Sequence, residues 1–392
     1  MKKTRSQDVF IPGAMPESTY ITRKTKTGFT YEERLEQALS VNGYMTFISG
    51  PSKIGKTVLC EKVIGLNNLI EVSGADFSQE RNMWAEIGAK AGMPIEATNI
   101  SRDVCENSMS ESGGSYVITK ESVINYFKEN NYVLLVDDFH YAKDSTQMFI
   151  AQQFKDAIRK GFKVIVASLP HRSDDAIRTN PDLQGRISII DIAAWTKDEL
   201  KEIPRKGFSE LGINISEKCI DKLAQESISS PQLMQLICLN ICTLENIDKC
   251  ETSEISIHDI DKLETAFRFS TSNLDYEKVA KAIRQGKNPR GKSRKKYKTS
   301  KFGELDLYGL ILEAIAIDPP IVSVDFSDLM KRIQSLIIGT EFPTTRSLKE
   351  YLDNLQEVLD IKDRSYEVVE WKDNTLYVLE SLFLFYLRWG RM

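Results

Sequence analysis

The sequence is poor in the residues that bind structural metals. It contains only three histidines, His140, His171 and His258, and none of its six cysteines stands in a Cys-x-x-Cys spacing. Because zinc sites need such residues at short spacings, the sequence argues against a structural zinc site. Cys238 and Cys242 fall on one face of an apolar helical stretch, where a cysteine is usually a small buried hydrophobe.

Long apolar runs and a strong charge imbalance are also missing. No run approaches the roughly 20 apolar residues of a membrane span, and the basic N-terminus leads into polar sequence instead of the apolar part of a secretory signal. We therefore expect a cytoplasmic protein with no membrane contact. The net charge of −4 argues against a protein that coats nucleic acid, and it leaves only local basic segments as candidates.

Short apolar runs alternate with amphipathic segments in the first half of the chain. Strands are expected at residues 44–49, 69–73, 132–136, 163–168 and 187–192. Helices are expected at residues 79–91, 121–129 and 145–159, with another that starts at residue 56. This alternation predicts an α/β fold with a mostly parallel sheet and helices on both faces. The polar stretch 97–114 is interpreted as an exposed insertion.

The second half of the chain has a different pattern. The predicted domains are an N-terminal segment with an α/β core (1–195), a helical lid (196–280), a basic linker (281–303) and a C-terminal domain (304–392). After Trp195 the β signals stop, so the lid is expected to be all-helical. The last domain shows three helical segments followed by two strand segments around residues 372–374, which is the order of a winged helix.

One loop carries the clearest chemical signal. Residues Gly50 to Thr57 fit the pattern GxxxxGK[ST], follow an expected strand and open an expected helix. In such a P-loop the backbone N–H groups surround phosphates, Lys56 reaches the β- and γ-phosphates, and the Thr57 hydroxyl binds Mg²⁺. The sequence therefore predicts an ATP site. Its predicted binding residues are Gly50, Pro51, Ser52, Lys53, Ile54, Gly55, Lys56, Thr57 and Val58.

Two acids follow the apolar strand segment 133–136. Asp137 is expected to hold Mg²⁺ together with Thr57, and Asp138 stands where a general base would polarise the attacking water. This is the pattern of a Walker B strand. Many relatives place the longer glutamate at the second position, so the shorter acid at Asp138 is consistent with slow hydrolysis.

Further catalytic residues are expected after the next two strands. Ser168 is the predicted γ-phosphate sensor, with His171 and Arg172 as alternatives, although the segment also reads as a simple strand-to-loop turn. Arg186 precedes the last strand, where a ring-forming ATPase presents an arginine finger to its neighbour. The alternatives are a surface salt bridge at Arg186, or Arg178 as the finger.

Taken in order, these motifs resemble the AAA+/STAND branch of P-loop ATPases, especially archaeal and bacterial ATPases akin to the origin-recognition complex. The resemblance implies that Tyr20 and Arg23 lie in an N-terminal box that packs on the adenine. It also implies that Pro231, in the stretch Ser229-Ser230-Pro231-Gln232, lies near the adenine as in STAND switch ATPases. ATP and Mg²⁺ are the implied cofactors. A homo-oligomer and a protein effector are the implied partners, in a setting such as bacterial defence or a mobile element.

Three function hypotheses follow. The first is a nucleotide-controlled oligomeric switch that regulates a partner protein. The second is an ATP-dependent DNA-binding loader or transposition regulator, for which the acid-free basic segment Lys281–Lys301, with its single aromatic Tyr297, is the best candidate contact. The third C-terminal helix, expected at 347–359, is acidic, so it is poorly suited to bind the phosphates of DNA. A nucleotide-binding scaffold without turnover is the third and plainest alternative.

Overall fold

The chain forms two compact units. A computed structural model describes residues 4–77, 82–94, 118–142, 144–170, 183, 185–248, 255–287, 293–360 and 368–390. We call the first unit, Thr22–Pro51 with Gly55–Ala193, the sheet unit. We call the second unit, Met1–Ile21 with Ser52–Ile54 and Ala194–Met392, the helical unit. Each unit is described by itself.

The sheet unit is built on a five-stranded parallel sheet with the order β2-β3-β4-β1-β5. The strands are β1 (Met45–Ser49), β2 (Leu69–Ser73), β3 (Val133–Asp137), β4 (Val164–Ser168) and β5 (Ile187–Asp191). The residues of β1 and β4 are all buried, and all but the last residue of β3 are buried. Continuous burial of this kind is typical of strands that are covered on both faces.

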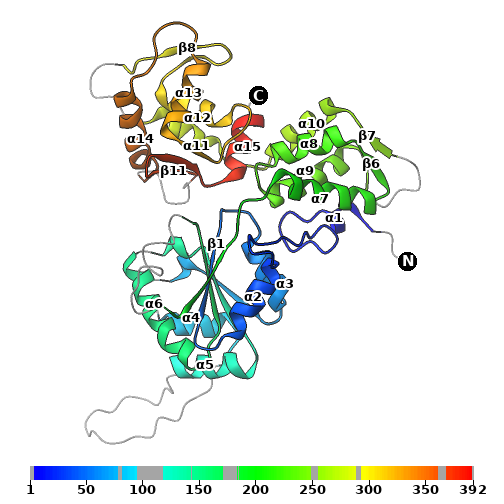
Figure 1. Cartoon of the computed structure of the whole chain (residues 1–392), viewed down its shortest axis with the longest axis vertical. Helices are drawn as coiled ribbons and strands as arrows, with labels where there is room; N and C mark the ends of the chain where they lie inside the picture. The colour runs from blue at the N-terminus through cyan, green and yellow to red at the C-terminus, as the bar shows by residue number, and fades with distance from the viewer. Residues whose placement is uncertain are drawn as a thin grey trace, which may run out of the picture. The chain divides into compact units, whose positions relative to one another are not determined.

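Helices cover both faces of this sheet, with α2 and α3 on one side and α4 to α6 on the other (Figure 1). Their bounds are α2 (Tyr31–Ser40), α3 (Lys56–Ile64), α4 (Met83–Lys90), α5 (Lys120–Glu129) and α6 (Asp144–Arg159). Two 3₁₀ turns, η1 (Gly74–Asp76) and η2 (Phe139–Tyr141), follow β2 and β3. The predicted parallel α/β fold is thus confirmed, with boundaries close to those expected. The predicted insertion at 97–114 lies outside the described residues.

The first part of the helical unit corrects one expectation. Its helices are α1 (Ser6–Val9), α7 (Lys197–Glu210), α8 (Glu217–Glu226), α9 (Pro231–Leu244) and α10 (Ile260–Thr271). The expectation of an all-helical lid was wrong, because β6 (Ile213–Ile215) and β7 (Ile255–Ile257) pair as a parallel two-stranded sheet. Three-residue strands are too short to produce a visible alternation, and these two lie about 40 residues apart in the sequence.

The C-terminal part of the helical unit contains more folded structure than expected. Its helices are α11 (Glu277–Gln285), α12 (Leu307–Ala316), α13 (Phe326–Leu336), α14 (Thr345–Asp360) and α15 (Ser381–Trp389). Its strands are β8 (Tyr297–Thr299), β9 (Gly303–Leu305), β10 (Ser323–Asp325), β11 (Val369–Lys372) and β12 (Thr375–Val378). The sheet β10-β12-β11 is antiparallel and β8 pairs with β9. The expected basic linker therefore includes the end of α11 and a hairpin, while the winged-helix assignment stays a prediction.

Within the described ranges, no helix has both the length and the apolar character that a membrane crossing requires. The longest described helices, α6 and α14, have 16 residues each. A membrane-spanning helix needs about 20 apolar residues.

The cysteines for which a position is described are buried thiols. Cys60 lies on α3, Cys219 on α8, and Cys238 and Cys242 on α9. Burial raises the pKa of Cys60, with a smaller contribution from the charge of Asp137, and burial also raises the pKa of Cys238 and Cys242. The prediction that Cys238 and Cys242 are core residues is confirmed.

A buried carboxylate connects α8 with the C-terminal helix α15. The fully buried Glu226 accepts two hydrogen bonds of 2.8 Å from Arg388, one of 2.8 Å from Trp389 Nε1 and one of 3.0 Å from Lys222. Burial alone raises the pKa of Glu226, but the hydrogen bonds and charge of Arg388, together with Trp389 and Lys222, lower it below its ordinary value. The carboxylate is therefore ionised and fully paired.

We expect Glu226→Gln to lower the free energy of unfolding by about 3 kcal/mol, because it leaves the guanidinium of Arg388 without its buried partner. Urea denaturation at neutral pH measures this change. The matched control is Glu277→Gln, which removes an exposed carboxylate paired with Lys281 one helical turn away and should leave the urea midpoint unchanged.

The pH dependence of this effect has a definite sign. Because the folded-state pKa of Glu226 is lowered, its contribution to stability is present above the pKa of an unfolded glutamate, about 4.3, and is lost as the pH falls through the folded-state value. The difference between the parent and Glu226→Gln should thus shrink in acid. A difference that persists unchanged in acid would contradict an electrostatic role for Glu226.

Candidate nucleotide-binding site

The loop Gly50–Thr57 joins the end of β1 to the start of α3. Gly55 is the N-cap of α3 and has a φ of 95°, a left-handed conformation that a side chain would strain. α3 begins at Lys56, and Val58 lies half-buried in its first turn. Since the first N–H groups of a helix have no acceptor inside the helix, such a start is suited to an anion. The loop thus has the conformation that its sequence pattern predicts.

Lys56 is folded into this loop. Its side chain is buried, and Nζ donates hydrogen bonds to the carbonyl oxygens of Gly50 at 3.0 Å and Pro51 at 2.9 Å. The ammonium group is therefore held in the concave side of the loop by neutral acceptors. Phosphate oxygens carry full negative charge and would be stronger acceptors for the same group.

Thr57 and Asp137 meet across the C-terminal edge of the sheet. The Thr57 hydroxyl donates to Asp137 Oδ2 at 2.5 Å, although β4 separates β1 from β3. A hydroxyl and a carboxylate are hard oxygen donors of the kind that Mg²⁺ uses alongside substrate phosphates, so this pair fits the predicted metal. Burial raises the pKa of Glu71 on the adjacent strand β2, and the charge of Asp137 adds to this shift.

Asp138 lies on a turn beyond the strand. It is the N-cap of η2 and has φ 48° and ψ 45°, in the left-handed region. Its backbone N–H donates to Asp137 Oδ1 at 2.8 Å, which leaves Oδ2 directed at Thr57. Aspartate enters this backbone region more readily than most residues, which gives a physical reason for the shorter acid at this position.

Ser168 ends β4 and lies beside the start of the loop. It is in register with Ser49, and its carbonyl oxygen accepts a 3.2 Å hydrogen bond from the N–H of Gly50. The side chain is buried. Its backbone therefore helps to hold the loop, while its role as a sensor stays a prediction. The alternatives His171 and Arg172 lie outside the described residues.

Arg186 lies at the other end of the strands. It directly precedes β5, and its carbonyl oxygen accepts from the N–H of Met45 at 2.9 Å. Because β1 spans about 16 Å at roughly 3.3 Å per residue, Arg186 is far from the Gly50 loop of its own chain. Arg186 could therefore act as an arginine finger only at the nucleotide of another copy of the chain. This role stays a prediction. Arg178 lies outside the described residues.

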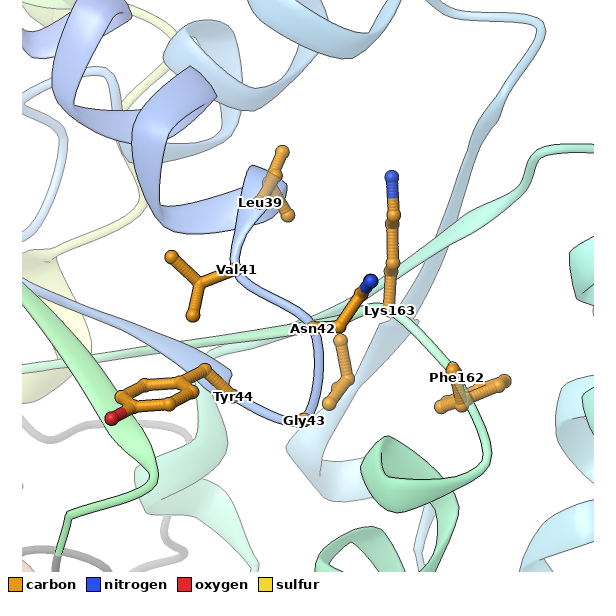
Figure 2. A pocket seen from close by; sticks show the side chains of 9 residues that line it. Leu39, Val41, Asn42, Gly43, Tyr44, Phe162 and Lys163 are labelled. Carbon is orange, nitrogen blue, oxygen red and sulfur yellow. The ribbon is translucent and has the colours of Figure 1, made fainter.

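A small hollow is found at this same end of the strands. It is lined by Leu39, Val41, Asn42, Gly43, Tyr44, Gly161, Phe162, Lys163 and Val164, seven of which are labelled in Figure 2. Its volume is about 10 Å³, which is room for about one water molecule. The hollow is therefore far too small for a nucleotide.

The residues predicted to contact adenine have structural contacts of their own. Arg23 is buried, donates to the carbonyl of Ala193 at 2.9 Å and lies over the ring of Tyr31 at 5.5 Å. Tyr20 offers its carbonyl to Lys206 at 3.1 Å in the helical unit. Arg23 thus ties its segment to the end of β5. The adenine roles of Tyr20 and Arg23 stay predictions.

Pro231 is the first residue of α9, where its missing N–H costs nothing. The preceding Ser230 caps the helix by accepting from the N–H of Leu233 at 3.2 Å. This local structure agrees with a helix that starts at the proline. The adenine role of Pro231 stays a prediction.

The tip of the loop, Ser52–Ile54, belongs to the helical unit. Trp195 Nε1 donates to the carbonyl of Ile54 at 2.9 Å, and Ser52 Oγ donates to Glu380 Oε1 at 3.0 Å. Ser230 Oγ lies 3.4 Å from the carbonyl oxygen of Lys53. Sequence reasoning missed Trp195 and Glu380. A tryptophan at the predicted domain boundary was the one available signal, because a half-buried indole N–H needs an acceptor.

The basic segment Lys281–Lys301 differs from the exposed loop that was expected. Its described ion pairs are Lys281–Glu277, Arg284–Glu313, Lys287–Glu357, Arg294–Asp306 and Lys295–Glu341. Tyr297 is buried in the β8–β9 hairpin, so it is not available to stack on a base. Arg290 and Lys292 lie outside the described residues. Five of the basic side chains are thus paired with carboxylates from the folded structure around the segment.

Comparisons with known proteins agree with this geometry. The family model of the NB-ARC domain matches residues 30–175. Among curated proteins, none matches the sequence. The chain is similar in structure to a Walker-type ATPase of Pyrococcus abyssi, with a TM-score of 0.51 and 15% identity over 91% of this chain and 94% of that one.

Two further solved structures are more distant. Cdc6p of Pyrobaculum aerophilum has a TM-score of 0.44 and 14% identity over 97% of each chain. The RuvB Holliday junction branch migration motor of Thermotoga maritima has a TM-score of 0.40 and 15% identity over 91% of this chain and 95% of that one. At these identities structural similarity concerns the fold alone. Residues 30–175 are therefore similar to an NB-ARC domain, and the fold of the chain is similar to that of a Walker-type ATPase.

Proposed function

We propose that the protein is a Mg²⁺-dependent ATPase that uses ATP binding and slow hydrolysis to control its own assembly and a partner protein. The observation that carries this proposal is the 2.5 Å contact between the Thr57 hydroxyl and Asp137 Oδ2. It joins the phosphate loop to the acidic end of β3, which is the arrangement that a metal-bound nucleotide needs.

The chemistry follows from the positions of these groups. The N–H groups at the start of α3 and the Lys56 ammonium would bind the β- and γ-phosphates. Mg²⁺, when bound by Thr57 and Asp137, would neutralise part of the phosphate charge. Asp138 would accept a proton from water as the water oxygen bonds to the γ-phosphorus and the bond to the β-phosphate oxygen breaks, releasing ADP and phosphate.

The proposal that assembly depends on ATP rests on Arg186. The residue lies away from its own phosphate loop, so any contact with a γ-phosphate would be made in a neighbouring copy. A binding site completed by a second copy makes association depend on the bound nucleotide. We propose that the downstream activity belongs to a partner protein.

The second candidate function, an ATP-dependent DNA-binding loader or regulator, is favoured by one observation. Lys296, Lys298 and Lys301 are exposed on or beside the β8–β9 hairpin, and in the described part of the chain no ion pair holds them. Three exposed cations on one hairpin are a modest basis for phosphate binding. The buried Tyr297 and the five ion pairs of the segment weigh against it.

We expect Lys56→Ala to weaken ATP binding by roughly 10- to 100-fold, because it removes charge-assisted hydrogen bonds to phosphate. Titration calorimetry measures this change. The matched control is Lys62→Ala in the last turn of the same helix, which removes the same charge and should leave ATP affinity unchanged. Equal effects of the two substitutions would show that Lys56 acts only through net charge.

The same variant tests the switch. Size-exclusion chromatography with light scattering, run with ATP, with ADP and with neither, should show a larger species for the parent protein in ATP alone. Lys56→Ala should stay in the smaller form under all three conditions. An ATP-independent oligomer in both proteins would contradict the switch.

We expect Asp138→Asn to lower kcat by about 100-fold or more, because asparagine tolerates the left-handed backbone but does not accept the proton from water. ATP affinity should change little, since the phosphate loop is untouched. Phosphate release and calorimetry together separate the two effects. Asp156→Asn, on the exposed surface of α6, is the control and should behave as the parent does.

Salt dependence tests the DNA hypothesis. If the hairpin binds duplex DNA, replacing Lys296, Lys298 and Lys301 by alanine should reduce the slope of log affinity against log salt concentration by about 2.7, at about 0.9 per phosphate contact. Fluorescence anisotropy with labelled duplex, in the presence of ATP, measures the slope. A parent protein with no affinity for DNA, or with a slope that the substitutions do not change, would remove this second function.

A further inference from the structure

Gly74 lies where two backbone turns of the sheet unit meet. It is buried, follows β2 directly and is the first residue of η1. A Cβ atom at this position would lie 2.6 Å from the carbonyl oxygen of Asp138 and 2.7 Å from Phe139 Cα. Both are backbone atoms, so a turn would have to shift to admit the methyl group. The φ of Gly74 is not left-handed, so glycine is needed here for space and not for backbone freedom.

The opposing turn is the one that carries Asp138. The carbonyl oxygen of Asp138 accepts a 3.0 Å hydrogen bond from the N–H of Tyr141, and this oxygen is the atom that an added Cβ would meet. The N–H of Asp138 donates to Asp137 Oδ1 at 2.8 Å. Displacement of the turn at Asp138 would therefore move the N–H group that orients the carboxylate of Asp137.

Strand pairing and hydrogen bonds also hold the segment around Gly74 in place. Ser73 is in register with Asp137 on the adjacent strand, which fixes the end of β2 against β3. The N–H of Ser73 donates to Asp76 Oδ2 at 3.0 Å, and Ser73 Oγ accepts from the N–H of Ala75 at 3.2 Å. These two hydrogen bonds hold η1 in place. We therefore expect an added Cβ atom at Gly74 to displace the turn at Asp138 and not η1.

We infer that Gly74 is a positioning residue of the ATPase site. Its missing side chain lets η1 support the Asp138 turn in the left-handed conformation, and this support sets where the carboxylates of Asp137 and Asp138 lie relative to Thr57. The inference rests on the proposed ATPase function. It adds a residue that touches neither nucleotide nor metal and that carries no chemical group of its own.

The experiment compares Gly74→Ala with Gly88→Ala in the full chain. Gly74→Ala should lower kcat by at least about tenfold, since small displacements of catalytic groups are costly, and should leave Mg²⁺-free ATP binding within about threefold of the parent. Gly88 is a buried glycine of α4 whose added Cβ would meet the side chains of Ile118 at 3.0 Å and Val123 at 3.3 Å. Those side chains can shift, so the control should keep the parent kcat.

The outcomes separate a positioning role from a merely structural one. A folded Gly74→Ala protein with the parent kcat would overturn the inference. If Gly74→Ala does not fold, Asp76→Ala takes its place, because it removes an exposed carboxylate that caps η1 without adding bulk. We expect a several-fold lower kcat for Asp76→Ala with the parent stability, and an unchanged kcat in this variant would equally overturn the inference.

A readout without turnover distinguishes this inference from the proposed function. If the parent protein binds ATP through Lys56 but releases no phosphate, hydrolysis is excluded. The role of Gly74 is then tested by the change in ATP affinity on adding Mg²⁺. The gain in ATP affinity on adding Mg²⁺ depends on Asp137, so Gly74→Ala should lose most of that gain while its Mg²⁺-free affinity is retained. A full Mg²⁺ gain in Gly74→Ala would refute the positioning role whatever the parent's activity.

Discussion

The strand order of the parallel sheet is the constraint on which the candidate site depends. All five strands point the same way, so the loops that follow β1, β3 and β4 leave from one edge. β4 lies between the other two, and its last carbonyl holds the N–H of Gly50. The hydroxyl of Thr57 then reaches Asp137 across the width of that strand. Parallel pairing of the strands thus brings together two side chains, Thr57 and Asp137, that lie about 80 residues apart in the sequence.

Much of the arrangement of the candidate site could be predicted because it follows from local sequence patterns. The apolar runs of the strands and the glycines that frame Lys56 are contiguous, and the residue before α3 must be one that accepts a left-handed backbone. The pairing of Thr57 with Asp137 follows from the same patterns once a parallel sheet is assumed. The conformation of Asp138 does not, because it depends on a turn packed against Gly74, which lies about 60 residues away in the sequence.

The parts that could not be predicted share one physical cause. Each is a contact between residues far apart in the chain, such as the pairing of β6 with β7, the hydrogen bond of Trp195 to the phosphate loop and the burial of Arg23. The basic segment shows the effect most clearly. Its acidic partners come mainly from α12 and α14 and from neighbouring turns, so a count of charges within the segment overstates the field that it presents to a ligand.

The reactivity of the buried thiols can report on local opening of the fold. Only a thiolate reacts readily with a maleimide or an oxidant, and burial that raises the thiol pKa keeps Cys60, Cys238 and Cys242 protonated in the closed structure. Each then reacts only during excursions in which its own helix opens. Cys60 lies directly behind the phosphate loop on α3, whereas the other two lie on α9. Without any introduced label, the chain thus carries natural probes that report separately on the opening of its two units.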